Sequence, residues 1–119
     1  MSFNRRKFVR SFIYAARGLR VLAGQQNARF HLFAAAAVVV VGVLLDLGRM
    51  DWLWIFAAIA LVLMAEAFNT AIEKLADTIS SQYHPHIEHA KDVAAAAVLI
   101  AAIGAAIIGL LIFYPYLIE

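Results

Sequence analysis

Three long apolar stretches dominate the chain and are separated by short polar segments. They cover residues 30–48, 52–72 and 91–118. About 20 apolar residues in a helix span the roughly 30 Å hydrocarbon core of a bilayer, so each stretch is long enough to cross a membrane. The uninterrupted apolar runs within the first two stretches are only 14 residues long, a length that also suits a buried helix of a soluble bundle. A hydrophobic content of 65% and a mean hydropathy of +0.83 favour the membrane.

Residues 2–22 show a different pattern, in which apolar and basic side chains fall on opposite sides of one helix. The apolar side carries Phe8, Phe12, Ala15, Ala16, Leu19 and Leu22, and the basic side carries Arg6, Arg10 and Arg17. We expect this helix to lie flat on the membrane, where its cations are drawn to anionic head groups. Two interpretations stay open: the helix is only an anchor, or some of its cations also contact an anionic ligand.

The charge distribution predicts the topology. Seven Lys and Arg residues and no acidic residue precede Leu32, which by the positive-inside rule places the N-terminus in the cytoplasm. The connection over residues 74–91 is then cytoplasmic as well. Four aromatic residues of the kind that favours the membrane interface share the outer side, namely Trp52, Trp54, Tyr114 and Tyr116. The sequence thus predicts one all-α integral membrane domain over residues 1–119, with a surface helix and three transmembrane helices.

Polar side chains form a narrow stripe on the second span. At about 100° per residue, the stripe covers about 100° of the helix circumference and consists of Glu66, Asn69, Thr70, Glu73 and Asp77. Ionisable groups within a membrane span cost on the order of 3 kcal/mol each, so a cluster of them indicates a functional site. Glu66 follows 14 apolar residues, about 21 Å of helix, and lies in the inner part of the bilayer. The later members lie nearer the cytoplasm.

Such a stripe lets a membrane-embedded hydroxyl group meet a water-soluble reagent, and its residue types suit phosphoryl transfer. Carboxylates and substrate phosphates together bind Mg²⁺. Lys91 can neutralise phosphate oxygens, and the deeper carboxylate can orient or deprotonate an alcohol. The sequence contains neither a Walker A motif nor the protein-kinase signatures. Any nucleotide site must therefore be of another kind.

Several segments carry a family resemblance. They are Glu66-Ala-Phe-Asn69-Thr70-Ala-Ile-Glu73-x-x-x-Asp77, Tyr83-His84-Pro85, Ala90-Lys91-Asp92-Val-Ala-Ala-Ala-Ala-Val98, Ser11-Phe12-x-Tyr14-Ala15 with Gly18-Leu19, and Arg29-x-His31-Leu32. Together they closely resemble the prokaryotic diacylglycerol kinase family, which includes the undecaprenol kinases. The segments around Tyr83 and Lys91 are slightly more similar to the undecaprenol kinases. Both acceptors are primary alcohols on long apolar tails.

The resemblance implies a homotrimer in the bacterial cytoplasmic membrane, with composite active sites between subunits that face the cytoplasm. It implies ATP and Mg²⁺ as co-substrates, a membrane lipid alcohol as acceptor, and no nucleic-acid partner. By matching positions, Glu66 resembles the catalytic base and Glu73 a metal ligand, and the residues expected to support them are Asn69, Thr70 and Asp77. Thr70 also suits a bond to its own helix backbone. The expected nucleotide contacts are Gln82, Tyr83, His84, Lys91 and Asp92, with Tyr14 and either Lys7 or Arg10 from the surface helix.

One departure concerns a metal-binding glutamate that the family usually supplies just before the first span. This chain has Gln25 and Gln26 there, and Gln25 is the better match. An amide oxygen coordinates Mg²⁺ without contributing charge. Two consequences stay open: weaker metal affinity, or one Mg²⁺ that is held mainly by ATP. In either case we expect lower, but not absent, activity.

Non-catalytic interpretations of the same residues exist. Glu66 can hydrogen-bond between helices, Glu73 and Asp77 can form interface ion pairs, and Lys91 with Asp92 can be a charged helix start. A cluster of His84, His86 and His89, with His31 nearby, raises the alternative of zinc or haem. For the whole protein, the rival hypotheses are a small non-enzymatic assembly or regulatory subunit and an ion- or proton-relay oligomer.

Overall fold

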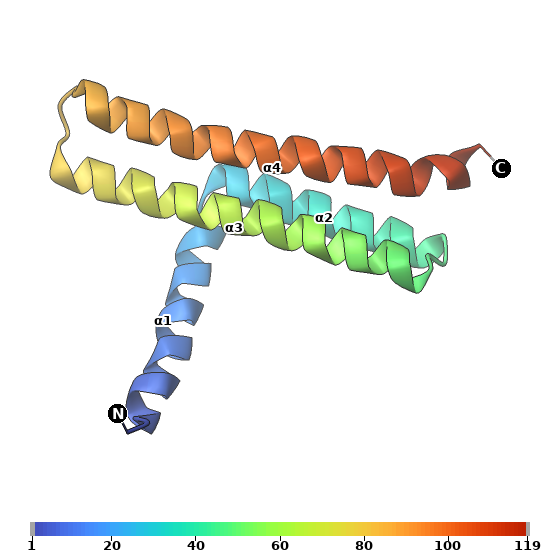
Figure 1. Ribbon diagram of the computed structural model, residues 1–119, viewed down its shortest axis with the longest axis horizontal. Coiled ribbons are helices and arrows are strands. Elements are labelled where there is room, and N and C mark those ends of the chain that lie inside the picture. Colours follow the sequence, from blue (N-terminus) through green and yellow to red (C-terminus); the bar gives the residue numbers. More distant parts are fainter. Residues whose placement is uncertain (1, 119) are drawn as a thin grey trace.

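The structure, a computed structural model, describes residues 2–118. These residues form four helices: α1 (Arg5–Ala23), α2 (Gln26–Leu44), α3 (Arg49–Ile79) and α4 (Pro85–Leu117). Figure 1 shows α2, α3 and α4 running alongside one another, whereas α1 projects steeply away from them. By length and composition, α2, α3 and α4 are each able to cross a membrane. The predicted all-helical fold, with three helices long and apolar enough to span a membrane, is confirmed.

Helix α3 is the central element, because it packs along α4 on one side and against α2 on the other. Its 31 residues extend over about 46 Å, which exceeds a hydrocarbon core of about 30 Å. An apolar cluster of Leu47, Ile55 and Ile112 holds the three helices together near the start of α3. At the same end, the hydroxyl of Tyr116 donates a hydrogen bond of 3.2 Å to Asp51 Oδ2. The opposite end of α3 carries the acidic stripe and extends past the apolar span.

The turn between α2 and α3 is tight and fixes how the two helices pack. Asp46 has a φ of 56°, in the left-handed region that Asp tolerates better than most residues. The amide of Leu47 then donates back to the carbonyl oxygen of Gly42 at 3.2 Å, which closes the helix end. Gly42 is buried, and a Cβ added there would lie 2.8 Å from the Trp52 ring. A glycine is required for this close packing of Trp52 on α2.

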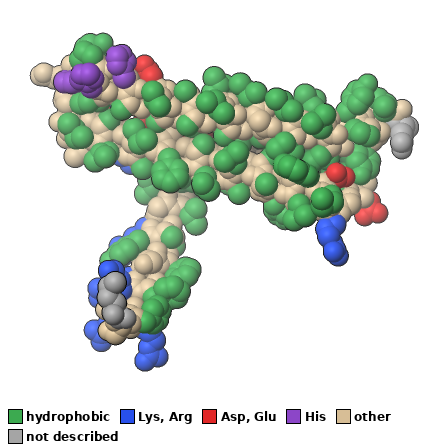
Figure 2. All heavy atoms as spheres, in the orientation of Figure 1, with side chains coloured by type: hydrophobic (Ala, Val, Ile, Leu, Met, Phe, Trp, Pro, Cys, Tyr) green, Lys and Arg blue, Asp and Glu red, His purple; other side chains and the backbone are tan. Residues whose placement is uncertain are grey.

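Helix α4 begins at Pro85, before the start at Lys91 that hydropathy alone predicts for the third span. The sequence at the loop explains the earlier start. Pro85 lacks an amide hydrogen and suits the first helical turn. His84 acts as the N-cap residue, because its Nδ1 accepts a hydrogen bond of 3.2 Å from the amide of His86. The histidine side chains gather at this end of the molecule in Figure 2.

Helix α1 contacts α2 and α3 and makes no contact with α4 within the described residues. Figure 1 shows the C-terminal end of α1 beside the middle part of α3. The one buried residue of α1 is Leu22, next to the junction with α2. Two of its phenylalanines, Phe8 and Phe12, stack edge to face with ring centres 5.2 Å apart. They remain 51% and 64% exposed, and Figure 2 shows that apolar side chains also cover the visible sides of the other three helices.

Candidate active site

Polar side chains from two parts of the chain line one pocket of about 160 Å³. The acidic stripe of α3 forms one wall. The junction between α1 and α2 forms the other wall. The lining residues are Gln25, Gln26, Asn27, Glu66, Asn69, Thr70 and Glu73. The structure thus brings together four of the five stripe residues and the position where the family resemblance leads one to expect a glutamate.

Local hydrogen bonds fix the shape of the junction between α1 and α2. The amide of Gln25 donates to the carbonyl oxygen of Leu22 at 3.0 Å, and Arg29 Nε donates to the carbonyl oxygen of Ala23 at 3.0 Å. Gln25 is the N-cap residue of α2, and its side chain makes no capping hydrogen bond. The amide groups of a first helical turn have no acceptor within the helix. The pocket therefore combines carboxylates, side-chain amides and the positive end of a helix dipole.

Glu66 is the most deeply buried functional group, with 1% of its surface exposed. Its Oε1 lies 3.2 Å from Nε2 of His31 on α2. Among residues 2–118, Oε1 has no hydrogen-bond partner, so the two atoms are close but not aligned as a hydrogen bond. A buried carboxylate with an unpaired oxygen is costly to a fold, which favours a functional role over a purely structural one.

Asn69 and Glu73 are coupled one helical turn apart. Asn69 Nδ2 donates to Glu73 Oε1 at 3.2 Å, and this bond holds the partly buried Glu73 carboxylate at the pocket wall. Asn69 itself is 7% exposed, as is Thr70. Oδ1 of Asn69 is buried, and no described residue forms a hydrogen bond with it. The pocket thus offers a second unpaired oxygen besides the one on Glu66.

Asp77 and Lys91 form an ion pair at the exposed end of the stripe. Lys91 Nζ donates to Asp77 Oδ1 at 2.7 Å, and the Asp77 side chain is 65% exposed. The pair joins α3 to the first turns of α4 and keeps the ammonium group on the side of α4 that faces the stripe. Exposure therefore increases along the stripe from Glu66 to Asp77.

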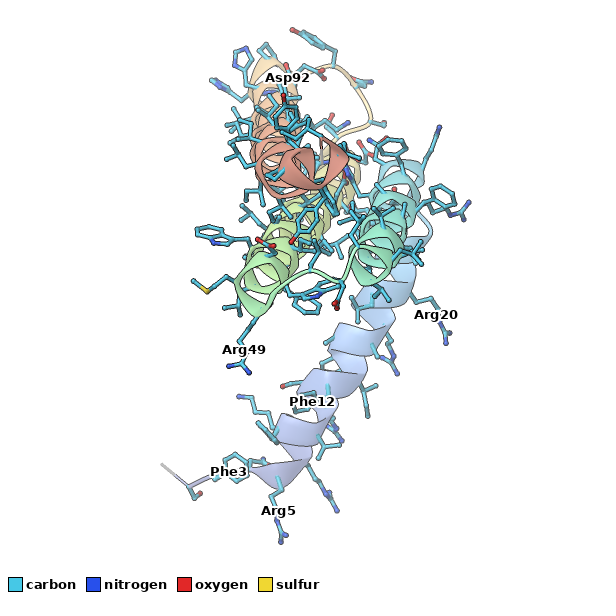
Figure 3. The ribbon with its side chains drawn as sticks, turned by 90° about the vertical axis from the view of Figure 1, so that its right-hand side faces the viewer. Phe3, Arg5, Phe12, Arg20, Arg49 and Asp92 are labelled. Atoms are coloured by element: carbon cyan, nitrogen blue, oxygen red, sulfur yellow. The ribbon has the colours of Figure 1, made fainter. Side chains whose placement is uncertain are left out.

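The remaining expected nucleotide contacts are spread over two separate regions. Gln82, Tyr83 and His84 lie in the exposed loop between α3 and α4, and Asp92 is exposed on α4. Lys7 and Tyr14 line a surface groove on α1, together with Asn4, Arg6, Arg10 and Ser11. Figure 3 shows Asp92 and Arg5 at opposite ends of the molecule. One chain alone does not bring the α1 residues to the loop.

The metal-binding capacity of the chain is limited. Within residues 2–118, no three His, Cys, Asp or Glu side chains gather closely enough to hold a metal ion, and this includes the histidine cluster that raised the alternative of zinc or haem. Mg²⁺ requires fewer protein ligands than such a three-residue site, because it is usually bound by one or two carboxylates, and waters and substrate phosphates complete its coordination shell. Glu73 and the amide oxygen of Gln25 fit that requirement, and the unpaired Oδ1 of Asn69 adds an oxygen in the same pocket.

An apolar groove of about 350 Å³ lies between α2, α3 and α4. Its walls are Phe, Ala, Val, Leu, Ile and Gly side chains, and His31 is the polar exception among the lining residues. Since His31 touches Glu66 and Glu66 lines the polar pocket, the groove and the pocket meet at this pair.

From the sequence, His31 had no suggested role beyond the zinc or haem alternative, and Asn27 had none. The structure places both residues at these cavities. His31 carries a recognisable signal, since an imidazole at the start of a membrane span is unusual. Asn27 carries none, because a polar residue before a span is ordinary.

A buried carboxylate, on a helix long and apolar enough to span a membrane, lies where a polar pocket meets an apolar groove. This arrangement is typical of a membrane protein that brings a polar ligand to an apolar one. The family model for prokaryotic diacylglycerol kinase matches residues 13–113. This chain therefore belongs to the prokaryotic diacylglycerol kinase family, which confirms both the resemblance and the predicted class of lipid kinase.

Individual relatives agree with the family. The chain is 43% identical to an undecaprenol kinase of Bacillus subtilis over 112 residues, which cover 93% of this chain and 91% of that protein. It is 39% identical to a diacylglycerol kinase of Synechocystis over 111 residues, 92% of this chain and 63% of that longer protein. It is 35% identical to the diacylglycerol kinase of Escherichia coli K12 over 103 residues, 85% of this chain and 84% of that protein.

Proposed function

We propose that this chain is a bacterial membrane kinase that transfers the γ-phosphoryl group of ATP to the primary hydroxyl of undecaprenol, with diacylglycerol as the alternative acceptor. The observation that carries the proposal is the position of Glu66, a buried carboxylate where an apolar groove meets a polar pocket. The preference for undecaprenol is supported by the 43% identity to an undecaprenol kinase.

Glu66 is the catalytic base in this proposal. The acceptor hydroxyl approaches from the apolar groove and loses its proton to the Glu66 carboxylate. Its oxygen forms a bond to the γ-phosphorus, the bond from that phosphorus to the bridging oxygen breaks, and ADP leaves. The shielding of Glu66 from water supports this role, because a dry site limits the transfer of the phosphoryl group to water instead of lipid.

Glu73 and Gln25 are the proposed metal ligands, and Asn69 and Asp77 support the site from the same helix. Mg²⁺ supplies charge neutralisation of the phosphate oxygens when it is bound. The hydrogen bond from Asn69 fixes the Glu73 carboxylate towards the pocket. Thr70, which lines the same pocket, adds a hydroxyl group to its wall.

We propose that a nucleotide contacts Lys91 and Asp92 on α4 and the loop residues Gln82, Tyr83 and His84. Lys91 already faces the stripe through its 2.7 Å contact with Asp77. Lys7 and Tyr14 on α1 belong to the same expected set but do not approach α4 within one chain. This separation supports a homotrimer in which α1 of a neighbouring subunit completes each nucleotide site.

The same arrangement supports the proposed orientation. Helix α1 lies on the cytoplasmic surface of the membrane, with Phe8 and Phe12 directed into the lipid and the arginines towards head groups. The N-terminus and the polar pocket then face the cytoplasm, where ATP is available. The exposed apolar side chains of α1 would find cover in the bilayer surface.

Purified protein in detergent micelles tests the proposal directly. We expect ADP release and lipid phosphate formation when ATP, Mg²⁺ and undecaprenol are all present, and slower turnover with diacylglycerol. Glu66→Gln should lower kcat by roughly 100-fold or more, the usual contribution of a general base. The matched control is Asp46→Asn, the same acid-to-amide change in the exposed α2–α3 turn, where Asn also tolerates the φ of 56°.

The outcomes separate the hypotheses. An absence of ADP release with any lipid alcohol, with Glu66→Gln indistinguishable from wild type, would contradict the kinase proposal and favour an assembly or regulatory subunit. Equal turnover of both acceptors would contradict only the preference for undecaprenol.

A further inference from the structure

The contact between His31 and Glu66 joins two cavities of different character. His31 lines the apolar groove between α2, α3 and α4, in which its neighbours are Phe30, Ala34 and Ala35. Glu66 lines the polar pocket with Asn69 and Glu73. Since His31 Nε2 lies 3.2 Å from Glu66 Oε1, the pair stands where a hydroxyl on an apolar tail would meet the pocket.

Glu66 needs a partner that fixes its orientation. Its side chain is 2% exposed, and that of His31 is 19% exposed. Oε1 has no hydrogen-bond partner in the described part of the chain, although an imidazole nitrogen lies within donor distance. Hydrogen bonds of catalytic groups are often poorly aligned in a ligand-free site and tighten when substrate binds. A small rotation of either side chain would turn this contact into a hydrogen bond.

We propose that His31 is a positioning residue for Glu66: its Nε2–H donates to Oε1 and holds the carboxylate towards the hydroxyl that enters from the apolar groove. This inference rests on the proposed function, because it assumes that Glu66 accepts the proton of a lipid hydroxyl. His31 acts through Glu66 and takes no proton itself. A carboxylate held by one donor keeps its orientation while it acts as a base, and misplacement of a catalytic group by about 1 Å can cost 100-fold in rate.

A purely structural role for the pair is the competing explanation, since the contact also joins α2 to α3. The two roles differ in what a substitution changes. Loss of a structural contact lowers the melting temperature and the amount of folded protein. Loss of positioning lowers kcat and leaves the KM for ATP and for the lipid close to their wild-type values.

The experiment compares two substitutions at His31 with one control, using the full-length protein in micelles with ATP, Mg²⁺ and undecaprenol. His31→Leu removes the donor but keeps an apolar side chain in the groove wall. His31→Gln keeps a side-chain N–H donor at a similar distance from the backbone. Phe33→Leu, at a side chain 79% exposed on the other side of α2, controls for a substitution of similar size.

We expect kcat to fall about tenfold or more in His31→Leu, to recover most of the way in His31→Gln, and to stay at the wild-type value in Phe33→Leu. Glu66→Asp in a double-mutant cycle adds a second criterion. If His31 acts through Glu66, adding His31→Leu to Glu66→Asp should cost less than it does in the wild-type background.

Three results would overturn the inference. One is a wild-type kcat in His31→Leu. Another is an equal loss in His31→Leu and His31→Gln with a lowered melting temperature, which indicates a structural contact. A third is full additivity with Glu66→Asp. In all three cases the wild-type protein still phosphorylates lipid, so the proposed function stands; if the wild type shows no turnover, both fail.

Discussion

Replacement of Gln25 by glutamate should lower the Mg²⁺ requirement of this enzyme. Gln25 is partly buried and lines the same pocket as Glu66 and Glu73. The substitution adds one negative charge to a pocket whose lining now carries two carboxylates. The new side chain also sits at the N-cap of α2, where an anion is favoured by about 0.3–1 kcal/mol. We therefore expect Gln25→Glu to fold normally when Mg²⁺ is present.

The magnitude follows from the charges. Two unit charges about 4 Å apart interact by about 1 kcal/mol in water, so a carboxylate and a divalent cation gain about 2 kcal/mol. Salt at physiological strength screens part of this gain. A remaining gain of about 1.4 kcal/mol corresponds to a tenfold lower half-saturating concentration of Mg²⁺. Repulsion between the carboxylates is present before the metal binds, so it adds to the preference for the metal-bound state.

The assay titrates free Mg²⁺ at saturating MgATP and lipid and follows ADP release. Gln26→Glu serves as the comparison, because Gln26 lines the same pocket but is more exposed, and its shift should be smaller. Thermal unfolding supplies an independent readout: Gln25→Glu should melt below wild type in EDTA and regain stability with Mg²⁺. An unchanged Mg²⁺ requirement in both glutamate variants would refute the reasoning from charge and remove Gln25 from the proposed metal ligands.

Three further outcomes are expected. Gly42→Ala should destabilise the fold by about 1–3 kcal/mol, because the new Cβ would lie 2.8 Å from the Trp52 ring. Thermal unfolding in detergent measures this loss. Gly104→Ala is the control: its Cβ would meet no described atom within 4 Å, so the stability should stay at the wild-type value. Lys91→Met should raise the KM for ATP about tenfold or more without lowering the melting temperature. Lys74→Met, at an exposed lysine outside the site, is the control. A comparable rise in KM in that variant would contradict a specific contact between Lys91 and phosphate. EDTA should abolish turnover and added Mg²⁺ should restore it, and turnover that continues in EDTA would contradict the proposed metal requirement.

The membrane-spanning helices and the polar stripe could both be predicted from the sequence because each depends on local periodicity. Long apolar stretches indicate spans whatever their neighbours are, and side chains three or four residues apart share one face of a helix. Glu66 and Glu73 could thus be placed on one face without knowledge of the fold. The start of α4 at Pro85 was missed because hydropathy does not register a helix turn that lies outside the apolar stretch.

The partners of the stripe could not be predicted in the same way. Whether His31 or a neighbour faces Glu66 depends on how α2 is rotated and shifted along α3, and that is set by the Gly42–Trp52 contact and the turn at Asp46. These are packing details with no periodic signal. Family resemblance pointed to Gln25 or Gln26 by position alone, and the structure adds that both side chains line the pocket with Glu73.

Helix α3 holds a buried carboxylate and an exposed ion pair at a fixed separation. Glu66 is 1% exposed, whereas the Asp77 side chain, three turns further along α3, is 65% exposed. The rise between these two residues is about 16 Å at 1.5 Å per residue, so the helix itself fixes the distance between the buried carboxylate and the exposed ion pair. A loop could not hold that separation, because its ends would move relative to each other. Burial of Glu66 is unfavourable in free energy, and the packing of α2 and α4 on α3 offsets it. A substitution that loosens this packing, such as Gly42→Ala, should therefore also reduce turnover in the protein that remains folded.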